Sequence, residues 1–355
     1  MMKKRYSLLV VLAMLLSLTA CGSKAPSKSG TPSASSANPS PAVSSPAPSG
    51  SNDATPTFDT KWPQKTIQLV CPYAAGGDTD YYTRATAKYL EKILGVTVVV
   101  VDTSGASGTT GALSVLDQDA DGYSFLFGHQ SVLFNQAAGS VPFDYLTDFV
   151  AVGSPMVDYT YGLYCHPDAP YSTLAELADY CKAHPGEVST IAATGGSSGM
   201  NAALMEQALG GIEFKLVEGP SSSAEKLAGF LGGQYDLLTG NFAQYKDYVA
   251  DGSIVCLGNY GSQDVPVLTE QGIYSWKTQG YDHSEDYMFM IRAKAGTDQV
   301  ILDKLAWALE EVCKDPEFQT EVAVYNATVG FQNGDACVAY QQNYLDKAAA
   351  FLAAQ

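Results

Sequence analysis

The sequence predicts an α/β protein in which two lobes enclose a ligand cleft. Runs of β-forming residues alternate with amphipathic segments throughout residues 58–355, and this alternation is typical of α/β folds with largely parallel sheets. The stretch of about 300 residues is long enough for two lobes. Two glycine-bearing turns, each between a predicted strand and a predicted helix, offer the backbone N–H groups that anion sites use.

The N-terminus predicts export and a lipid anchor. Three basic residues, Lys3 to Arg5, precede an apolar run over residues 8–18, and Leu18-Thr19-Ala20-Cys21 follows. We interpret residues 1–20 as a lipoprotein signal peptide, cleaved before Cys21, whose thiol is then acylated. The apolar run is shorter than the about 20 residues that a membrane span needs. An uncleaved anchor is the alternative, and it places the rest of the chain on the same outer face of the cell membrane.

Composition separates a linker from the folded part. Residues 21–57 consist almost wholly of Ser, Pro, Ala, Gly and Thr, so we expect a disordered linker that cannot bury a core.

The whole chain has a net charge of −17, and residues 1–53 contain five basic residues and one acidic residue, which leaves −21 on the remainder. Nucleic-acid binding is therefore not expected, because it requires clustered Lys and Arg.

The cysteines and histidines predict neither a metal site nor a cofactor. Once Cys21 is acylated, six cysteines remain. Six cysteines outside the cytoplasm permit 15 disulfide pairings, but a protein of this size needs none. No Cys-x-x-Cys motif occurs, and the four histidines show no metal-ligand spacing.

The first turn, Pro72 to Asp80, is the strongest candidate for a ligand loop. A predicted strand over 66–71 precedes it, and a predicted helix over 81–94 follows and ends at Gly95. Free N–H groups at a helix N-terminus can hold an anion. The simpler alternative is a tight turn in which Asp78 or Thr79 caps the helix. The candidate ligand residues of this turn are Tyr73, Ala74, Ala75, Gly76, Gly77, Asp78, Thr79 and Asp80.

Further strands and helices are predicted along the rest of the chain. Thr173 to Glu176 form a capping box for a helix ending near His184, and another helix begins at Thr297 and reaches about Lys314. The glycines of residues 104–111 lack dinucleotide-binding spacing. Thr194 to Gly199 follow a strand and precede a helix over 201–209, which makes a second anion-binding turn. The remaining strands are predicted at 96–101, 123–127, 161–165, 189–193, 214–217, 235–238, 254–257 and 287–292.

Several short motifs, in order and at characteristic spacing, carry a family resemblance. They are Trp62-Pro63 with Lys65, Pro72 to Gly77 with Asp80, Asp121-Gly122-Tyr123, Asp144 to Phe149, Thr173 to Leu177 with Pro185-Gly186, Leu231 to Asp236, Gly296-Thr297 and Asp315-Pro316-Glu317. Together the motifs span nearly all of residues 58–355. The chain resembles the Bug-type extracytoplasmic solute-binding proteins of tripartite tricarboxylate transporters.

The resemblance implies a two-lobed fold like that of type II periplasmic binding proteins, no enzymatic activity and a small carboxylate ligand. It implies lobe 1 over 58–163 plus 260–355 and lobe 2 over 164–259. The implied ligand loops are Tyr73 to Asp80 and Thr194, Gly195, Gly196, Ser197 and Ser198. At further strand ends that face the cleft we expect His129, Gln130, Ser131 and Asn241. The implied partners are a di- or tricarboxylate, an aromatic acid or an amino acid, and membrane transporter subunits. We expect a monomer.

Three departures from the family pattern leave the ligand open. One is that Gly219 to Ser222 stand where the family has a run of proline, an aromatic residue, a basic residue and glycine before the helix that leads to Leu231. Ala75 stands where the family usually has proline, and Asn201 or Ala202 stands near the position of a common histidine. The roles of the two acidic residues in the first turn also stay open. Asp78 and Asp80 can cap their own helix, or one of them can accept a hydrogen bond from an amine or hydroxyl of the ligand.

A serine hydrolase is the alternative function. Gly195 to Gly199 match the Gly-x-Ser-x-Gly nucleophile motif around Ser197, between a strand and a helix. A catalytic triad would need an acid and then a histidine downstream, and only His283 follows. No His-Gly-Gly-Gly segment precedes the motif. We therefore expect Ser197 to contact a ligand as a hydroxyl group and not as a nucleophile.

Overall fold

The structure is a computed structural model that describes residues 56–354 apart from residue 221. The predicted signal peptide, the acylated Cys21 and the linker as far as residue 55 lie outside the described residues. Within the described part, no helix has the length and apolar character needed to cross a membrane. The six cysteines of this part are all unpaired.

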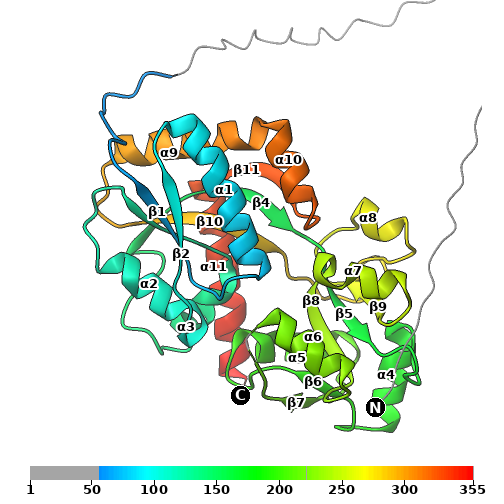
Figure 1. The fold of residues 1–355 in the computed structure, drawn as a ribbon. Coiled ribbons are helices and arrows are strands. Elements are labelled where there is room, and N and C mark those ends of the chain that lie inside the picture. Colours follow the sequence, from blue (N-terminus) through cyan, green and yellow to red (C-terminus); the bar gives the residue numbers. More distant parts are fainter. Residues whose placement is uncertain (1–55, 221, 355) are drawn as a thin grey trace, which may run out of the picture. The chain divides into compact units, whose positions relative to one another are not determined.

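The larger of two sheets has the strand order β11-β4-β10-β3-β1-β2 (Figure 1). Strand β1 pairs in parallel with β2 and β3, whereas β10 is antiparallel to both β3 and β4, and β11 is antiparallel to β4. The strands are β1 (Ile67–Cys71), β2 (Val98–Asp102), β3 (Ser124–Gly128), β4 (Phe149–Asp158), β10 (Tyr287–Lys294) and β11 (Thr328–Asn333).

The smaller sheet has the strand order β7-β6-β8-β5-β9. Strands β6, β7 and β8 are parallel, and β5 is antiparallel to β8 and β9. The expectation of largely parallel sheets was therefore wrong, because the strands that connect the two sheets run against their neighbours. The strands are β5 (Tyr161–Cys165), β6 (Ser189–Ile191), β7 (Lys215–Val217), β8 (Leu237–Asn241) and β9 (Val255–Asn259).

Helices cover both sheets. On the larger sheet, α1, α2, α9, α10 and α11 contact the strands directly, and α10 also packs on α1 and α9. These helices are α1 (Asp78–Leu94), α2 (Thr109–Leu116), α3 (Phe134–Ala137), α9 (Gln299–Lys314), α10 (Pro316–Ala323) and α11 (Gly334–Ala353). The helices of the smaller sheet are α4 (Leu174–Ala183), α5 (Ser197–Ala208), α6 (Ser223–Leu231), α7 (Phe242–Ala250) and α8 (Pro266–Thr269).

Local sequence explains the start and end of the first long helix. Tyr82, Ala85, Tyr89 and Leu90 of α1 recur at helical spacing and are buried, so one face of the helix packs on the larger sheet. Gly95 ends the helix with φ of 71°, and its N–H donates to the carbonyl of Glu91, as a left-handed glycine cap requires. The packed face fixes α1 behind β1, which places its N-terminus at the carboxyl end of the sheet.

The chain crosses between the sheets twice, and the crossings are hydrogen-bonded to each other. The first runs from β4 to β5 through residues 159–160, and the second runs from β9 to β10 through residues 260–286. Asn259 Nδ2 donates to the carbonyl of Tyr159 at 2.9 Å, and the Tyr260 N–H donates to the carbonyl of Tyr161 at 2.8 Å. The paired connections form the hinge between the lobes.

The sheets place the lobe boundaries a little away from those predicted. The expected division between residues 163 and 164 falls inside β5, which belongs wholly to the smaller sheet. Val265, Leu268 and Ile273, expected in lobe 1, pack in a core cluster with residues of the smaller sheet and its helices. We therefore propose that lobe 2 extends from about residue 160 to about residue 285.

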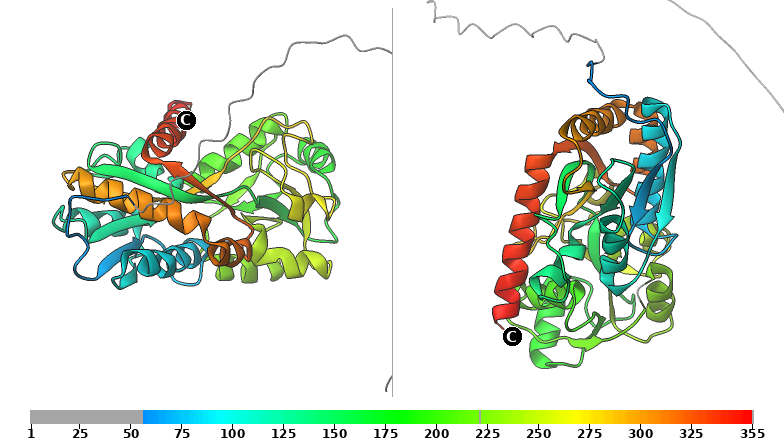
Figure 2. Two further views of the ribbon diagram at one scale, coloured as in Figure 1. Left: turned by 90° about the horizontal axis from the view of Figure 1, so that it is seen from above. Right: turned by 90° about the vertical axis from the view of Figure 1, so that its left-hand side faces the viewer.

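The C-terminal helix α11 connects the lobes at a third place. It lies along β4, and Figure 2 shows it running down one side of the molecule. Tyr344, Leu345 and Ala348 of α11 belong to a core cluster that also contains Met200 of α5. The helix therefore packs against an element of each lobe.

A buried carboxyl group lies at the hinge. Asp158, the last residue of β4, is fully buried, and its Oδ1 accepts from the N–H and hydroxyl of Thr160, both at 2.7 Å. Its Oδ2 accepts from the hydroxyl of Tyr82 at 3.1 Å and from the amide of Asn241. Since Tyr82 lies on α1 and Asn241 ends β8, Asp158 connects elements of both lobes.

Burial of Asp158 predicts a stability change with pH. Desolvation raises the pKa of this carboxyl to about 7, although its hydrogen bonds to Thr160 and Tyr82 oppose the shift. An unfolded aspartate has a pKa of about 3.9, so the folded protein binds the proton more tightly between these values. The free energy of unfolding should therefore fall as pH rises from about 4 to about 7, by up to about 4 kcal/mol from this group.

Urea unfolding of Asp158→Asn at pH 4.5 and pH 7.5 measures this contribution. The variant should lose less stability between the two pH values than the wild type does. Asp303→Asn, which changes an exposed carboxylate on α9, should keep the wild-type dependence. If Asp158→Asn kept the wild-type pH dependence of the free energy of unfolding, the raised pKa of Asp158 would be contradicted.

Candidate functional site

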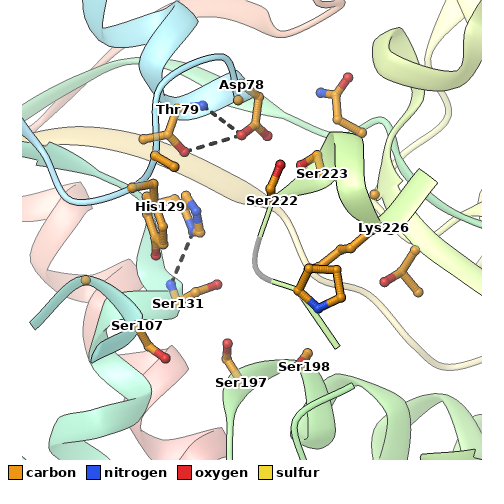
Figure 3. Close-up of a pocket in the computed structure, with 18 of the residues that line it drawn as sticks. Asp78, Thr79, Ser107, His129, Ser131, Ser197, Ser198, Ser222, Ser223 and Lys226 are labelled. Carbon is orange, nitrogen blue, oxygen red and sulfur yellow. Dashed lines mark hydrogen bonds between the residues drawn. The ribbon is translucent and has the colours of Figure 1, made fainter. Parts of the chain in front are cut away.

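A cavity of about 520 Å³ lies at the ends of the strands and takes its lining from both lobes (Figure 3). This volume is within the range of small-molecule sites. Lobe 1 contributes the first turn, the loop over 104–108 and the segment after β3. Lobe 2 contributes β5, the start of α5, the segment over 218–226 and the end of β8.

The first turn lines the cavity from Pro72 to Thr79, but Asp80 does not. Asp80 Oδ2 accepts from the Gly76 N–H at 2.8 Å, and its Oδ1 lies 2.6 Å from Nε of Arg84. Gly76 has φ of 87°, a conformation that glycine adopts without strain. Asp80 therefore fixes the first turn by hydrogen-bonding to it from the first turn of α1, and its side chain points away from the cavity.

Asp78 is the acidic residue of this turn that faces the cavity. It is the first residue of α1 and is 9% exposed. Its Oδ1 accepts from the Thr79 N–H at 2.7 Å, and its Oδ2 accepts from the hydroxyl of Tyr161 on β5. Burial raises the pKa of the carboxyl, and the bonds to Tyr161 and Thr79 oppose that shift.

An aromatic pair covers one wall of the cavity. The rings of Tyr73 and His129 stack at 4.9 Å between centroids, and His129 Nδ1 accepts from the Ser131 N–H at 3.3 Å. Desolvation, with a smaller contribution from Arg292, lowers the pKa of His129 to about 3. At neutral pH His129 is therefore uncharged, and it presents a flat polar surface to a ligand. Tyr73, His129 and Ser131 all line the cavity.

Gln130, which was also predicted as a ligand residue, points elsewhere. It is fully buried, and its Nε2 donates to Glu285 Oε1 at 3.1 Å. Burial raises the pKa of Glu285 to about 7. Successive residues after a strand end point in different directions. Gln130 therefore bonds to Glu285 in the connection between β9 and β10, whereas its neighbours His129 and Ser131 line the cavity.

The second turn contributes its last two predicted residues. Ser197 and Ser198 begin α5 and line the cavity, whereas Thr194, Gly195 and Gly196 are absent from its lining. The Thr194 N–H donates to Glu218 Oε1 at 3.0 Å, and the Gly196 N–H donates to the carbonyl of Ala193. The first turn of α5 itself contains no acidic residue, and its positive end faces the cavity. Glu218 is the acidic residue of lobe 2 in the lining.

Residues outside the predicted set complete the lining. Tyr161, Tyr260 and Tyr287 form an aromatic wall beside the hinge, in which Tyr161 and Tyr287 stack at 3.6 Å between centroids. Among the described residues of the lining, Lys226 of α6 is the only Lys or Arg. Desolvation lowers the pKa of Lys226, and the charge of Asp78 opposes that shift. The predicted Asn241 also lines the cavity, at the end of β8.

The geometry around Ser197 gives no support to a hydrolase. His283, the downstream histidine, is buried against Trp276 and Tyr260 and is absent from the cavity lining. Burial lowers its pKa to about 4. No hydrogen bond joins Ser197 to a histidine within residues 56–354 as described. A nucleophilic serine needs such a base.

Comparison with known families decides the assignment. A family model described as the tripartite tricarboxylate transporter family receptor matches residues 82–354. The chain belongs to this family. Members of the family are extracytoplasmic receptors and not enzymes, so the hydrolase alternative is set aside.

Relatives of this receptor match most of the chain, and those with solved structures share its fold. A protein of Cupriavidus necator, encoded in the gbd 5′ region, is 28% identical over 280 residues, which are 77% of this chain and 82% of the relative. The solved structure of the periplasmic binding protein BugD is 27% identical, with a TM-score of 0.70, and the match covers 81% of this chain and 97% of BugD. MatC of Rhodopseudomonas palustris, solved with bound malate, shares the fold at 20% identity and a TM-score of 0.72, over 82% of this chain and 99% of MatC.

The position of Asp80 predicts a structural effect that does not depend on ligand type. Asp80→Ala removes the acceptor of the Gly76 N–H and one partner of Arg84, so the first turn loses its fixed shape. We expect stability to fall by about 1–3 kcal/mol. Calorimetry should show the same loss of affinity for carboxylates with and without an amine.

Asp121→Ala is the matched control for this variant. It removes an exposed ion pair with Lys65 at 3.0 Å, which contributes little to stability. If Asp80→Ala weakened only amine-bearing ligands, Asp80 would instead contact the ligand directly.

Proposed function

We propose that this receptor is a cell-surface lipoprotein that binds a small carboxylate-bearing solute in the cavity between its lobes. It then delivers the solute to the membrane subunits of a tripartite tricarboxylate-type transporter. In this proposal the protein acts as a monomer, tethered by the acylated Cys21 through the linker over 21–57. The solute is a di- or tricarboxylate, an aromatic acid or an amino acid.

One observation carries the carboxylate assignment. The start of α5 and Lys226 of α6 provide positive potential on the same lobe, and both belong to the cavity lining. Ser197 and Ser198 add two hydroxyl groups at the helix end. An oxyanion bound at a helix N-terminus accepts charge-assisted hydrogen bonds, each contributing about 1.5–3 kcal/mol. Two or three such bonds approach micromolar affinity before ordering costs.

Closure of the lobes supports capture. The lining comes from both sides of a two-stranded hinge, so a solute contacts both lobes only when the lobes approach each other. Exclusion of water from the closed cavity strengthens its electrostatic interactions. We propose the following ligand contacts from the predicted set: Tyr73, Ala74, Ala75, Gly76, Gly77, Asp78, Thr79, His129, Ser131, Ser197, Ser198 and Asn241.

Replacement of Lys226 tests the carboxylate site. Thermal-shift screening of the purified protein against di- and tricarboxylates, aromatic acids and amino acids identifies a binding acid. Lys226→Gln should weaken that acid by about tenfold or more in calorimetry, because one charge-assisted hydrogen bond is lost.

Lys215→Gln, which changes an exposed lysine of β7 outside the cavity lining, should leave the affinity unchanged. Equal affinities of the wild type and Lys226→Gln would contradict the role of Lys226. If none of the acids raised the melting temperature of the protein, carboxylate capture itself would be contradicted.

Replacement of Cys21 tests the anchor. In the proposed lipoprotein the thiol of Cys21 carries the acyl chain, so Cys21→Ala leaves no site for it. Membrane fractionation should then show the variant released from the membrane pellet, and mass spectrometry should show no acyl mass. Recovery of the variant with the membranes, at the wild-type proportion, would contradict lipid anchoring through Cys21.

A further inference from the structure

The charged groups of the cavity are divided between its walls. On the lobe 1 side, Asp78 and Asp80 occupy the first turn of α1 and offset its positive end. On the lobe 2 side, Lys226 of α6 and Glu218 line the cavity, and the first turn of α5 has no acidic residue. Glu218 already accepts the Thr194 N–H, so the positive groups left for a ligand on this side are Lys226 and the start of α5. Figure 3 shows Asp78 and Thr79 on the opposite side of the cavity from Ser197 and Ser198.

Two N–H groups of the first turn are already used by the chain itself. The Gly76 N–H donates to Asp80, and the Thr79 N–H donates to Asp78. This turn therefore offers a ligand fewer donors than its glycines suggest. It offers a buried carboxylate instead.

Asp78 has no ion-pair partner among the described residues. Arg84, the basic residue nearest along the helix, pairs with Asp80 at 2.6 Å and with Asp102 at 2.6 Å. Asp78 contacts only the neutral donors Thr79 and Tyr161. The charge of Asp78 acts on Lys226 across the cavity, but no ion pair joins the two side chains. A buried carboxylate without an ion-pair partner is costly, and each of its oxygens can accept more than one hydrogen bond.

A second buried acceptor faces the same cavity. Asn201 on α5 is 6% exposed and lines the cavity, and its Oδ1 has no hydrogen-bond partner within the described part of the chain. Buried acceptors are rarely left unsatisfied in folded proteins. Asn201 and Asp78 thus show that the cavity has unused capacity to accept hydrogen bonds from a ligand.

We propose that the solute carries a protonated amine beside its carboxylate, and that Asp78 accepts the ammonium group. The carboxylate of the solute then lies toward Ser197, Ser198 and Lys226. This inference deepens the proposed function and rests on it, because it specifies an amino acid among the carboxylates considered above. A solute with carboxylates at both ends and no amine would bring a carboxylate close to Asp78 with no ammonium group between them, and like charges at such a distance repel.

Matched pairs of acids that differ only in the amine test the inference. The pairs are aspartate and succinate, glutamate and glutarate, 2-aminoadipate and adipate, and phenylalanine and 3-phenylpropionate. Calorimetry at pH 7.5 with the purified protein should show, for at least one pair, that the amine-bearing acid binds tenfold or more tighter. In Asp78→Asn that preference should fall by at least tenfold, with the amine-free acid bound as well as before or better.

Two variants separate this role from general damage. Lys226→Gln, on the carboxylate side, should weaken both members of a pair by the same factor. Asp78→Glu keeps the charge and should retain part of the preference for the amine. Circular dichroism melting of each variant shows that it is folded.

The outcomes distinguish this inference from the proposed function. Binding of acids without a preference for the amine-bearing member in any of the four pairs would overturn the inference and leave carboxylate capture intact. Equal weakening of both members of a pair by Asp78→Asn would also overturn it, because Asp78 would then act as a donor to carboxylates or as a structural residue. Failure of all eight acids to bind, while another carboxylate binds in the thermal-shift screen, would overturn the inference alone. Failure of every carboxylate in that screen would contradict the proposed function as well.

Discussion

The paired crossings between the sheets are the constraint on which the site depends. At the start of the two connections, Asn259 Nδ2 donates to the carbonyl of Tyr159 and the Tyr260 N–H donates to the carbonyl of Tyr161. Asp158 adds bonds to α1 and to the end of β8 at the same place. Because both lobes are fixed to this one hinge, the carboxyl ends of their parallel strands meet across a common cavity. The helices that begin there, α1 and α5, bring their N-termini to opposite walls.

The two helix ends differ in electrostatics although both follow glycine-bearing turns. In α1 the carboxylates of Asp78 and Asp80 lie in the first turn and offset the positive end of the helix dipole. The first turn of α5 begins with two serines and contains no acidic residue. The same backbone motif therefore produces one wall that accepts hydrogen bonds and another that attracts negative charge. Such a cavity can orient a solute as well as hold it, since reversal of the solute would oppose like charges.

The sequence predicted the parts of the fold that local patterns determine. The family and the two-lobed fold are confirmed. The Thr173–Glu176 capping box is present, with the Glu176 N–H donating to Thr173 Oγ1 at 3.2 Å.

The strand β4 and the helix α11 were not predicted from the sequence. In β4, Gly153 and Pro155 resemble a turn, and the strand accommodates them through irregular register with both neighbours. Patterns of local sequence do not reveal this, because the neighbouring strands are distant in sequence.

The site was less predictable, for geometric reasons. Asp78 and Asp80 both lie in the first turn of one helix, but at about 100° per residue they face directions about 200° apart. Only the packed orientation of α1 decides which of them meets the cavity. Nothing in the sequence around Lys226 predicted a binding role, because α6 comes to lie beside the cavity only when the lobe is folded. Ser197 and Ser198 were predicted because a helix N-terminus after a strand is itself a local pattern.

A crystal structure of the protein with a bound amino acid is the most direct test of how the cavity orients its ligand. We expect the lobes to close on the ligand, with its carboxylate at Ser197, Ser198 and Lys226 and its ammonium group within hydrogen-bond distance of Asp78. A carboxylate bound instead against the α1 turn, or a ligand that contacts neither α5 nor α6, would contradict this orientation.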